Sequence, residues 1–299
     1  MVWGMMIAWY LFLAGVSAGA YLTATYVSKK YPFADTIRKT GYLLAAPLLA
    51  IGLLLLVFDA EAGLMHPFRF IHLLRNFPTS MMTDGTYIIS VFLVVTGYQG
   101  VMVYLKKTVN RWVTRLGVIF AVGTMAYTGL LIGLVKAVPL WNTSILPVLF
   151  TVSAMSTGIA ATVLVATFFN RQACFNLLPL KKIHASLITL ELLLLFIMLY
   201  VTSNANDVAY QSVMSLLGGE YAGWFWGGLV GIGLIIPLLI EGTEIYQYRL
   251  ASKPKYVEIS AASANPSLLP ALLTEGFVLI GGFILRYLVL AAAVTITLL

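Results

Sequence analysis

Residues 145–169 read ILPVLFTVSAMSTGIAATVLVATFF, a run of apolar and small side chains that contains no charged residue. About 20 such residues in a helix span the roughly 30 Å hydrocarbon core of a bilayer. Seven further runs of this length occur at residues 7–28, 39–58, 85–105, 113–135, 183–202, 222–244 and 269–296. Only 10% of the 299 residues are charged, against about 25% in soluble domains. We therefore predict an all-α integral membrane protein with eight transmembrane helices.

The positions of the lysines and arginines predict the orientation of these helices. Fourteen of the 18 basic residues fall in or beside the connections that follow the first, third, fifth and seventh predicted helices. Cytoplasmic loops carry an excess of basic residues, so these connections are expected to face the cytoplasm and both termini to lie outside. The net charge of +7 is thereby explained by topology and does not indicate binding to nucleic acid.

The first and fifth predicted helices carry small residues at a matching spacing. The matched positions are Ala14, Gly15, Ser17 and Gly19 in the first helix and Ser153, Ala154, Ser156 and Gly158 in the fifth. This similarity predicts two related four-helix halves, residues 1–135 and 136–299, an arrangement found in many transporters. Small residues four positions apart also let membrane helices pack closely, and we expect Gly15 and Gly19 to have that packing role.

One polar stretch interrupts the apolar sequence, DAEAGLMHPFRFIHLLRNFPTSMMTDGT at residues 59–86. It contains two of the three histidines together with acidic and basic residues: Asp59, Glu61, His66, Arg69, His72, Arg75 and Asp84. Because it follows the second predicted helix, its loop, residues 59–84, is expected to face outward. If the protein handles protons or a polar head group, this is the most suitable place for it.

The sequence provides few ligands for a bound redox centre. Cys174 is the single cysteine, whereas iron–sulfur clusters are normally held by four. A membrane dihaem protein needs paired histidines deep in its helices, but His66 and His72 lie in or near the outer loop and His184 lies at the cytoplasmic start of a helix. We predict no haem, no iron–sulfur cluster and no metal site in this chain, so any electrons it handles must come from exchangeable molecules.

Charged residues within the predicted helices are costly and usually face a partner or water. Glu191 lies near the middle of the sixth helix, Glu275 in the inner part of the eighth, and Arg286 about 17 Å further out along it. One interpretation makes these three a proton path between the cytoplasm and an outer site, and the other makes them packing ion pairs or snorkelling ends. The second interpretation is favoured for Glu241 and Glu244. A secondary transporter with Glu191 and Arg286 near its substrate is an alternative function.

Seven stretches, in this order, carry a family resemblance. They are YLFLAGVSAGA (10–20), HPFRFIHLLRNFPTSMMTDG (66–85), AYTGLLIG (126–133), PLWNTSILPVLFTVSAMSTG (139–158), EL (191–192), FWGGLVGIGLIIPLLIE (225–241) and LLTEGFVLIGGFILRY (272–287). They resemble the NrfD-type membrane subunit of polysulfide reductases, over nearly the whole chain.

The resemblance implies a multi-pass subunit of the prokaryotic cytoplasmic membrane that binds menaquinone or ubiquinone near the outer face. Such a subunit exchanges electrons with a docked iron–sulfur subunit, which connects to a molybdopterin catalytic subunit, and the complexes can pair as dimers. The family pattern near the quinone falls on Arg69, His72 and Tyr127. Tyr10 stands where the best-known member has a histidine, and Asp84 stands where many relatives have a tryptophan, so no family role is assigned to Asp84.

The chemistry of a quinol fits these residue types. Its oxidation releases two electrons and two protons, so a site needs hydrogen-bonding groups for the two oxygens and a group that accepts a proton near neutral pH. We hypothesise that His72 or His66 contacts one oxygen and that Tyr127 or Tyr10 contacts the other. Imidazole is suited to proton transfer near neutral pH.

The local charge and the proton exit complete this hypothesis. Asp59 with Arg69 is expected to set the charge around the head group, and Asp59 or Glu61 is expected to pass protons to water. His72 and Asp59 are therefore the candidate catalytic residues. The terminal substrate and the direction of electron flow remain open at this point.

Overall fold

A computed structural model describes residues 3–59, 81–169, 178–251 and 268–295. Throughout these residues the regular structure is helical, and eight helices are long and apolar enough to cross a membrane. These spans are α1 (Met5–Lys30), α2 (Asp35–Asp59), α4 (Met81–Tyr104), α5 (Arg111–Gly133), α6 (Ile145–Phe169), α8 (Leu178–Ser203), the continuous pair η1 (Trp224–Ile235) and α10 (Ile236–Ala251), and α12 (Leu268–Ala291). The prediction of an all-α membrane protein with eight spans is confirmed.

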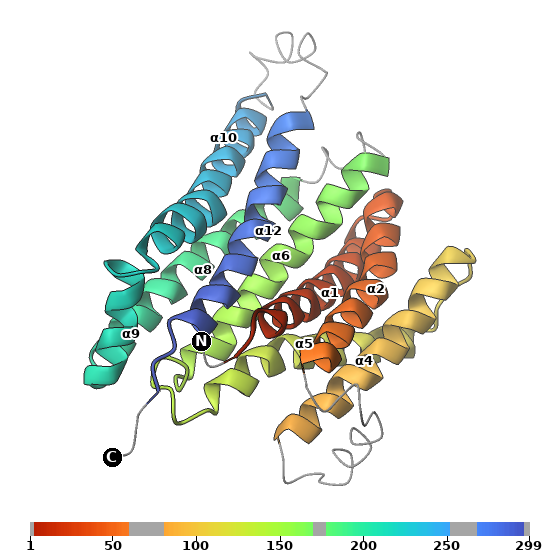
Figure 1. Cartoon of the computed structure of the whole chain (residues 1–299). Helices are drawn as coiled ribbons and strands as arrows, with labels where there is room; N and C mark the ends of the chain where they lie inside the picture. The colour runs from red at the N-terminus through yellow and green to blue at the C-terminus, as the bar shows by residue number, and fades with distance from the viewer. Residues whose placement is uncertain (1–2, 60–80, 170–177, 252–267, 296–299) are drawn as a thin grey trace.

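Helices α1 and α6 form the centre of the bundle and contact each other (Figure 1). The most apolar part of each is 67% buried inside the protein, whereas that of α2 is 28% buried. Helices α2, α4 and α5 lie to one side of this centre, α8 and α10 lie to the other, and α12 packs beside α6 and α1. The two four-helix halves, which stay a prediction, would therefore meet along α1, α5, α6 and α12.

The close contact between α1 and α6 depends on glycine. A Cβ atom added to Gly19 would lie 2.1 Å from the carbonyl oxygen of Ala154, and one added to Gly158 would lie 2.2 Å from the carbonyl carbon of Gly19. Neither position has room for a side chain, because the neighbouring atoms are backbone. The predicted packing role of Gly19 is confirmed, and Gly158 shares it.

Replacing Gly158 with valine is expected to destabilise the bundle, because α1 and α6 would have to move apart. Overpacking of this kind typically costs about 1–3 kcal/mol, and here the obstacle is a second backbone. Gly97→Val in α4 is the matched control, since an added Cβ there meets nothing within 4 Å. The midpoints of thermal unfolding in detergent measure both variants, and equal midpoints would contradict the proposed packing role.

The start of α1 and the end of α12 lie at the same end of the bundle (Figure 1). Trp141, in the turn between α5 and α6, is fully buried there, and its indole Nε1 donates a hydrogen bond to the carbonyl oxygen of Val289 at 2.6 Å. The ring of Trp3 packs on Trp141 with 5.3 Å between ring centroids. These contacts tie the beginning of α1 and the end of α12 to one turn. We call this end the terminal end, and the opposite end, where α1 finishes with Lys29 and Lys30, the basic end.

Two elements of the structure are not predicted from the sequence. Helix α9 (Asp207–Leu217) is short and is capped by the preceding residue, Asn206, whose side-chain oxygen accepts a hydrogen bond from the backbone amide of Ala209 at 2.8 Å. The glycine-rich η1 is a π-helix, in which the amide of Ile236 donates to the carbonyl five residues earlier, that of Gly231. A π-helix turns less per residue than an α-helix and is often found near functional sites. It therefore changes the directions in which the side chains of α10 point.

Candidate functional site

The two tyrosines predicted to bind the quinone lie together near the terminal end. Tyr10 in α1 is 1% exposed and Tyr127 in α5 is 6% exposed. The two side chains interact electrostatically. A buried phenol hydroxyl needs a hydrogen-bond partner. The two tyrosines therefore form a polar site between α1 and α5 in an otherwise apolar interior.

Helix α4 completes this position through Asp84 and Gly85. The ring of Tyr127 lies directly on the backbone of Gly85, where an added Cβ would be only 1.8 Å from its Cζ atom. Asp84 interacts electrostatically with Tyr127, and its Oδ1 atom is buried without a hydrogen-bond partner among the described residues. A buried unpaired acceptor is costly, so this oxygen is suited to receive a proton or a hydrogen bond from a bound molecule.

The expected position of Asp84 in the outer loop is wrong, because α4 begins at Met81 and includes it. No role for Asp84 follows from the sequence. The only nearby sequence feature that relates to its placement is the following glycine, Gly85, which lets the Tyr127 ring approach the start of α4.

Asp59, a predicted catalytic residue, lies at the last position of α2 beside the start of α1. A Cβ atom on Gly4, the residue that precedes α1, would lie 2.7 Å from the Oδ1 atom of Asp59. The positive end of the α1 helix dipole favours a carboxylate at this place. Asp59 therefore helps to hold the start of α1, the helix that carries Tyr10.

Three predicted quinone-binding residues, His66, Arg69 and His72, lie outside the described residues, as does Glu61. Their roles stay predictions. In sequence they fall between Asp59 and Met81, the ends of the two helices that border the Tyr10 and Tyr127 position.

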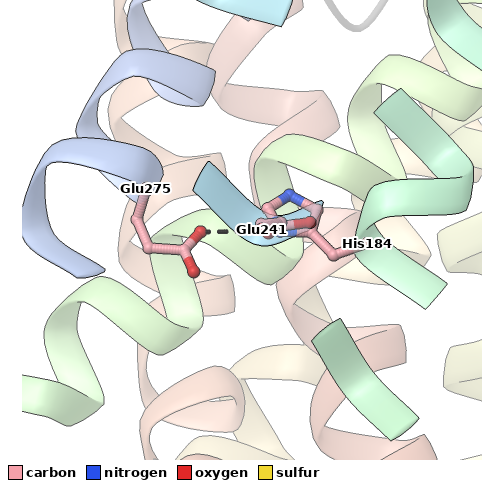
Figure 2. Close-up of side chains that lie close together, drawn as sticks. All are labelled: His184, Glu241 and Glu275. Atoms are coloured by element: carbon pink, nitrogen blue, oxygen red, sulfur yellow. Dashed lines mark ion pairs between the residues drawn. The ribbon is translucent and has the colours of Figure 1, made fainter. Parts of the chain in front are cut away.

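A second group of ionisable residues is buried nearer the basic end, where α8, α10 and α12 meet. Figure 2 shows His184, Glu241 and Glu275, one from each helix, pointing toward one another. The Nδ1 atom of His184 lies 2.6 Å from Oε1 of Glu241 and 3.7 Å from Oε2 of Glu275. The second imidazole nitrogen and one oxygen of each carboxylate are buried without hydrogen-bond partners among the described residues.

This group can hold either protons or a metal ion. Its three ligand atoms lie within 4.8 Å of one another, and an imidazole with two carboxylates is a set that zinc accepts. The 2.6 Å between His184 and Glu241 is a hydrogen-bond distance, whereas two ligands of a tetrahedral zinc lie about 3.3 Å apart because each is about 2 Å from the metal. In this geometry the two side chains share a proton, and a metal would have to separate them.

A third set of contacts surrounds Arg286, which is completely buried between α1, α6 and α12. Its Nη1 atom donates to Oγ of Ser153 at 3.1 Å and to the carbonyl oxygen of Gly282 at 2.7 Å. Its Nε and Nη2 atoms have no hydrogen-bond partner among the described residues. Glu191, also buried, interacts electrostatically with Arg286 and with His184. Glu191 therefore connects the region of Arg286 to the His184 group.

Glu191 interacts electrostatically with Arg286 and with His184, and His184 lies 3.7 Å from Glu275. The three residues predicted for a proton path are therefore linked only through His184, to which the sequence assigns no part in it, and the path stays a prediction. Glu244 forms an ion pair with Lys181, which confirms the structural interpretation of that glutamate. Glu241 also has an ion-pair partner, His184, but it is 2% exposed and is a full member of the buried group. The sequence gives no role to His184 beyond that of a haem ligand, which is rejected above.

Comparisons with known proteins agree with this architecture. The sequence model of the family described as "Polysulphide reductase, NrfD" matches residues 1–297. "Protein NrfD" of Escherichia coli is 29% identical over 94% of this chain and 95% of its own length. A component of the polysulfide reductase of Wolinella succinogenes is 32% identical over 80% of this chain and 83% of its own. A component of the selenate reductase of Mesobacillus selenatarsenatis is 28% identical over 80% of this chain and 66% of its own.

Proposed function

Since this chain belongs to the polysulphide reductase NrfD family, we propose that it is the quinone-binding membrane subunit of a respiratory oxidoreductase complex. Its membership supports a redox role as one subunit among several. The finer proposal is that it binds menaquinol or another quinone near the outer face and exchanges electrons with a docked iron–sulfur subunit. The terminal chemistry then takes place in a molybdopterin subunit.

The observation that carries the proposal is the group formed by the buried residues Tyr10 and Tyr127 with the half-buried Asp84. Two phenol hydroxyls can donate hydrogen bonds to a quinone oxygen, and the unpaired Oδ1 atom of Asp84 can accept one. These are polar groups on an otherwise apolar wall, the usual composition of a small-molecule site. A bound quinol supplies two electrons and two protons, and the residues of this chain position the head group and accept the protons.

The segment between α2 and α4 is proposed to complete the site. His72 or His66 would hold the second quinone oxygen, and Arg69 with Asp59 would set the charge around the head group. Imidazole can take a proton near neutral pH. Support for this part of the proposal comes from residue chemistry and from the position of the segment between the two helices that border the tyrosines.

We also propose a proton path through Glu275, Glu191 and Arg286, with His184 and Glu241 as its entry. The support is the chain of interactions from the His184 group to Arg286 through Glu191. Along α8, His184 and Glu191 are seven residues apart, a rise of about 10 Å. These residues therefore span part of the distance across the membrane between the basic end and the proposed quinone site at Tyr10 and Tyr127.

The membrane placement and the partners follow from the same proposal. The excess of basic residues on one side supports a cytoplasmic basic end and termini outside. Two of the relatives are named as components of multi-subunit reductases, which supports assembly with a catalytic subunit and an iron–sulfur subunit. Dimers of the complex are part of the proposal as well.

The proposal is tested by titrating the purified chain with a fluorescent quinol-site inhibitor of the hydroxyquinoline N-oxide class. We expect one binding site and, for Asp84→Ala, an affinity at least about tenfold lower, because a charge-assisted hydrogen bond contributes about 1.5–3 kcal/mol. Asp207→Ala is the control, since Asp207 is an exposed carboxylate in the first turn of α9. Saturable binding that is unaffected by Asp84→Ala would contradict the assigned site.

A transport assay separates the proposal from the alternative function. A secondary transporter built around Glu191 and Arg286 would move its substrate when reconstituted alone. An electron-transfer subunit should be inactive alone and should copurify with iron from its partner. Transport by the isolated chain, with no iron in the copurified material, would support the transporter.

A further inference from the structure

The basic end contains a cavity that plays no part in the quinone proposal. It has a volume of about 630 Å³ and lies between the ends of α1, α2, α4 and α5. Seven of its fifteen lining residues are lysine or arginine, and none is acidic. This volume is in the range of small-molecule sites, and the charge of the lining indicates an anionic occupant.

Most of this charge has no carboxylate beside it. Asp35 forms ion pairs with both Arg38 and Lys39, so one acidic group serves two of the seven cations. The other five come from the end of α1, from the connection between α4 and α5, and from the start of α5. Within the part of the chain that the structure describes, no carboxylate lies within ion-pair distance of these five. Such a concentration of like charge is unfavourable unless an anion is bound.

The floor of the cavity is a fixed polar surface. Gln99 is buried, accepts a hydrogen bond from the hydroxyl of Tyr21 at 2.7 Å and donates one to Thr114 at 3.5 Å. The hydroxyls of Thr25 and Tyr42 are hydrogen-bonded to each other at 3.1 Å. These contacts hold the lining helices in place, so the basic side chains surround a preformed space.

One of the cations in the cavity lining stands at a position where the backbone conformation is unfavourable. Lys106 adopts a left-handed conformation with φ of 56°, which is unfavourable for a residue other than glycine. This conformation ends α4 and sets Lys106 and Lys107 in the cavity lining. A glycine would fit the backbone better, but it would remove one of the cations.

The surroundings of the cavity indicate where the anion comes from. Trp112 and Tyr104, on the two helices beside the cavity, are 67% and 76% exposed, and aromatic side chains of this kind mark the level of the lipid head groups. Basic pockets between transmembrane helices bind phospholipid head groups with more than one phosphate. We propose that this cavity binds the head group of a phospholipid that carries two phosphates, of the diphosphatidylglycerol class.

Native mass spectrometry of the full chain, released from detergent, tests the proposal. We expect wild-type protein to retain a diphosphatidylglycerol added at low micromolar concentration and the double variant Lys107→Gln/Arg111→Gln to bind it at least about tenfold more weakly, since each basic residue near the lipid contributes. Lys30→Gln/Lys182→Gln removes the same charge from exposed residues outside the cavity, and its affinity should be unchanged. Equal losses in the two double variants would overturn a specific site.

Lys106→Gly separates lipid binding from folding. It relieves the left-handed conformation, so the thermal midpoint without lipid should be equal or higher, while the gain in midpoint on adding diphosphatidylglycerol should fall. Inorganic pyrophosphate offers the same phosphate chemistry without acyl chains. If pyrophosphate stabilises the protein as much as the lipid does, or if Lys106→Gly leaves the gain from lipid unchanged, the lipid site is overturned.

Discussion

Replacing Tyr127 with phenylalanine is expected to lower quinol turnover by the assembled complex about 100-fold, the lower part of the range for loss of a positioned proton-transfer or hydrogen-bonding group. The ring would still fill the space over Gly85, where an added Cβ would overlap it, so the packing between α4 and α5 should survive. What is lost is the hydroxyl that lies near Tyr10 and Asp84. The rate of oxidation of a water-soluble menaquinol analogue measures the effect.

Separate values of kcat and KM show whether the Tyr127 hydroxyl acts in proton transfer or in binding the head group. If the hydroxyl acts mainly while the proton leaves, kcat should fall and KM should change little. If it only holds the head group, KM should rise and kcat should stay near the wild-type value. Tyr98→Phe is the control, because Tyr98 lies on α4 and is 46% exposed. Full turnover by Tyr127→Phe in a complex of normal composition would remove Tyr127 from the site.

The fold was predictable because a bilayer permits so few structures. Each backbone polar group must be satisfied within the membrane, which leaves helices for a sequence of this kind. The span predicted at 39–58 is the helix Asp35–Asp59, and the span predicted at 113–135 is the helix Arg111–Gly133. The observed helices often run a few residues further, since polar residues at the ends can continue a helix into the head-group region.

The group around His184 was much harder to predict, because three helices far apart in sequence must bring it together. Glu241 follows a π-helical segment, so a count of 3.6 residues per turn from the preceding apolar face gives the wrong direction for its side chain. A histidine at the start of one helix and a glutamate near the end of another also fit side chains that extend to the membrane surface. Whether they do so or form a buried group depends on their burial, which is decided by the tertiary structure.

At the proposed quinone site, the sequence points to the tyrosines but not to the carboxylate. The family resemblance points to Tyr127, whereas Asp84 departs from the family pattern and so receives no role from it. The structure sets Asp84 beside Tyr127 because Gly85 admits the tyrosine ring. The predictions for His66, Arg69 and His72 concern residues outside the described ranges and await the mutational tests.

Replacing Arg286 with methionine should lower the free energy of unfolding by about 3–5 kcal/mol, the usual cost of removing one partner of a buried charged pair. Glu191 would keep its buried position while losing the cation that balances it. The packing of Arg286 against the rings of Phe12 and Phe150, at 5.7 Å and 5.2 Å from their centroids, would be partly preserved by the methionine. Denaturant unfolding of the chain in mixed micelles measures the change.

The double variant Arg286→Met/Glu191→Leu distinguishes an electrostatic interaction that only stabilises the fold from one that carries protons. Removing both charges leaves no unpaired buried group, so most of the lost stability should return. If Glu191 and Arg286 belong to the proton path, quinol-dependent proton uptake by reconstituted vesicles should stay low in this stable protein. Arg286→Lys keeps the charge without the planar guanidinium and should retain part of both properties. Normal proton uptake by the double variant would instead assign the pair to packing and leave the His184 group without a connection toward the quinone position.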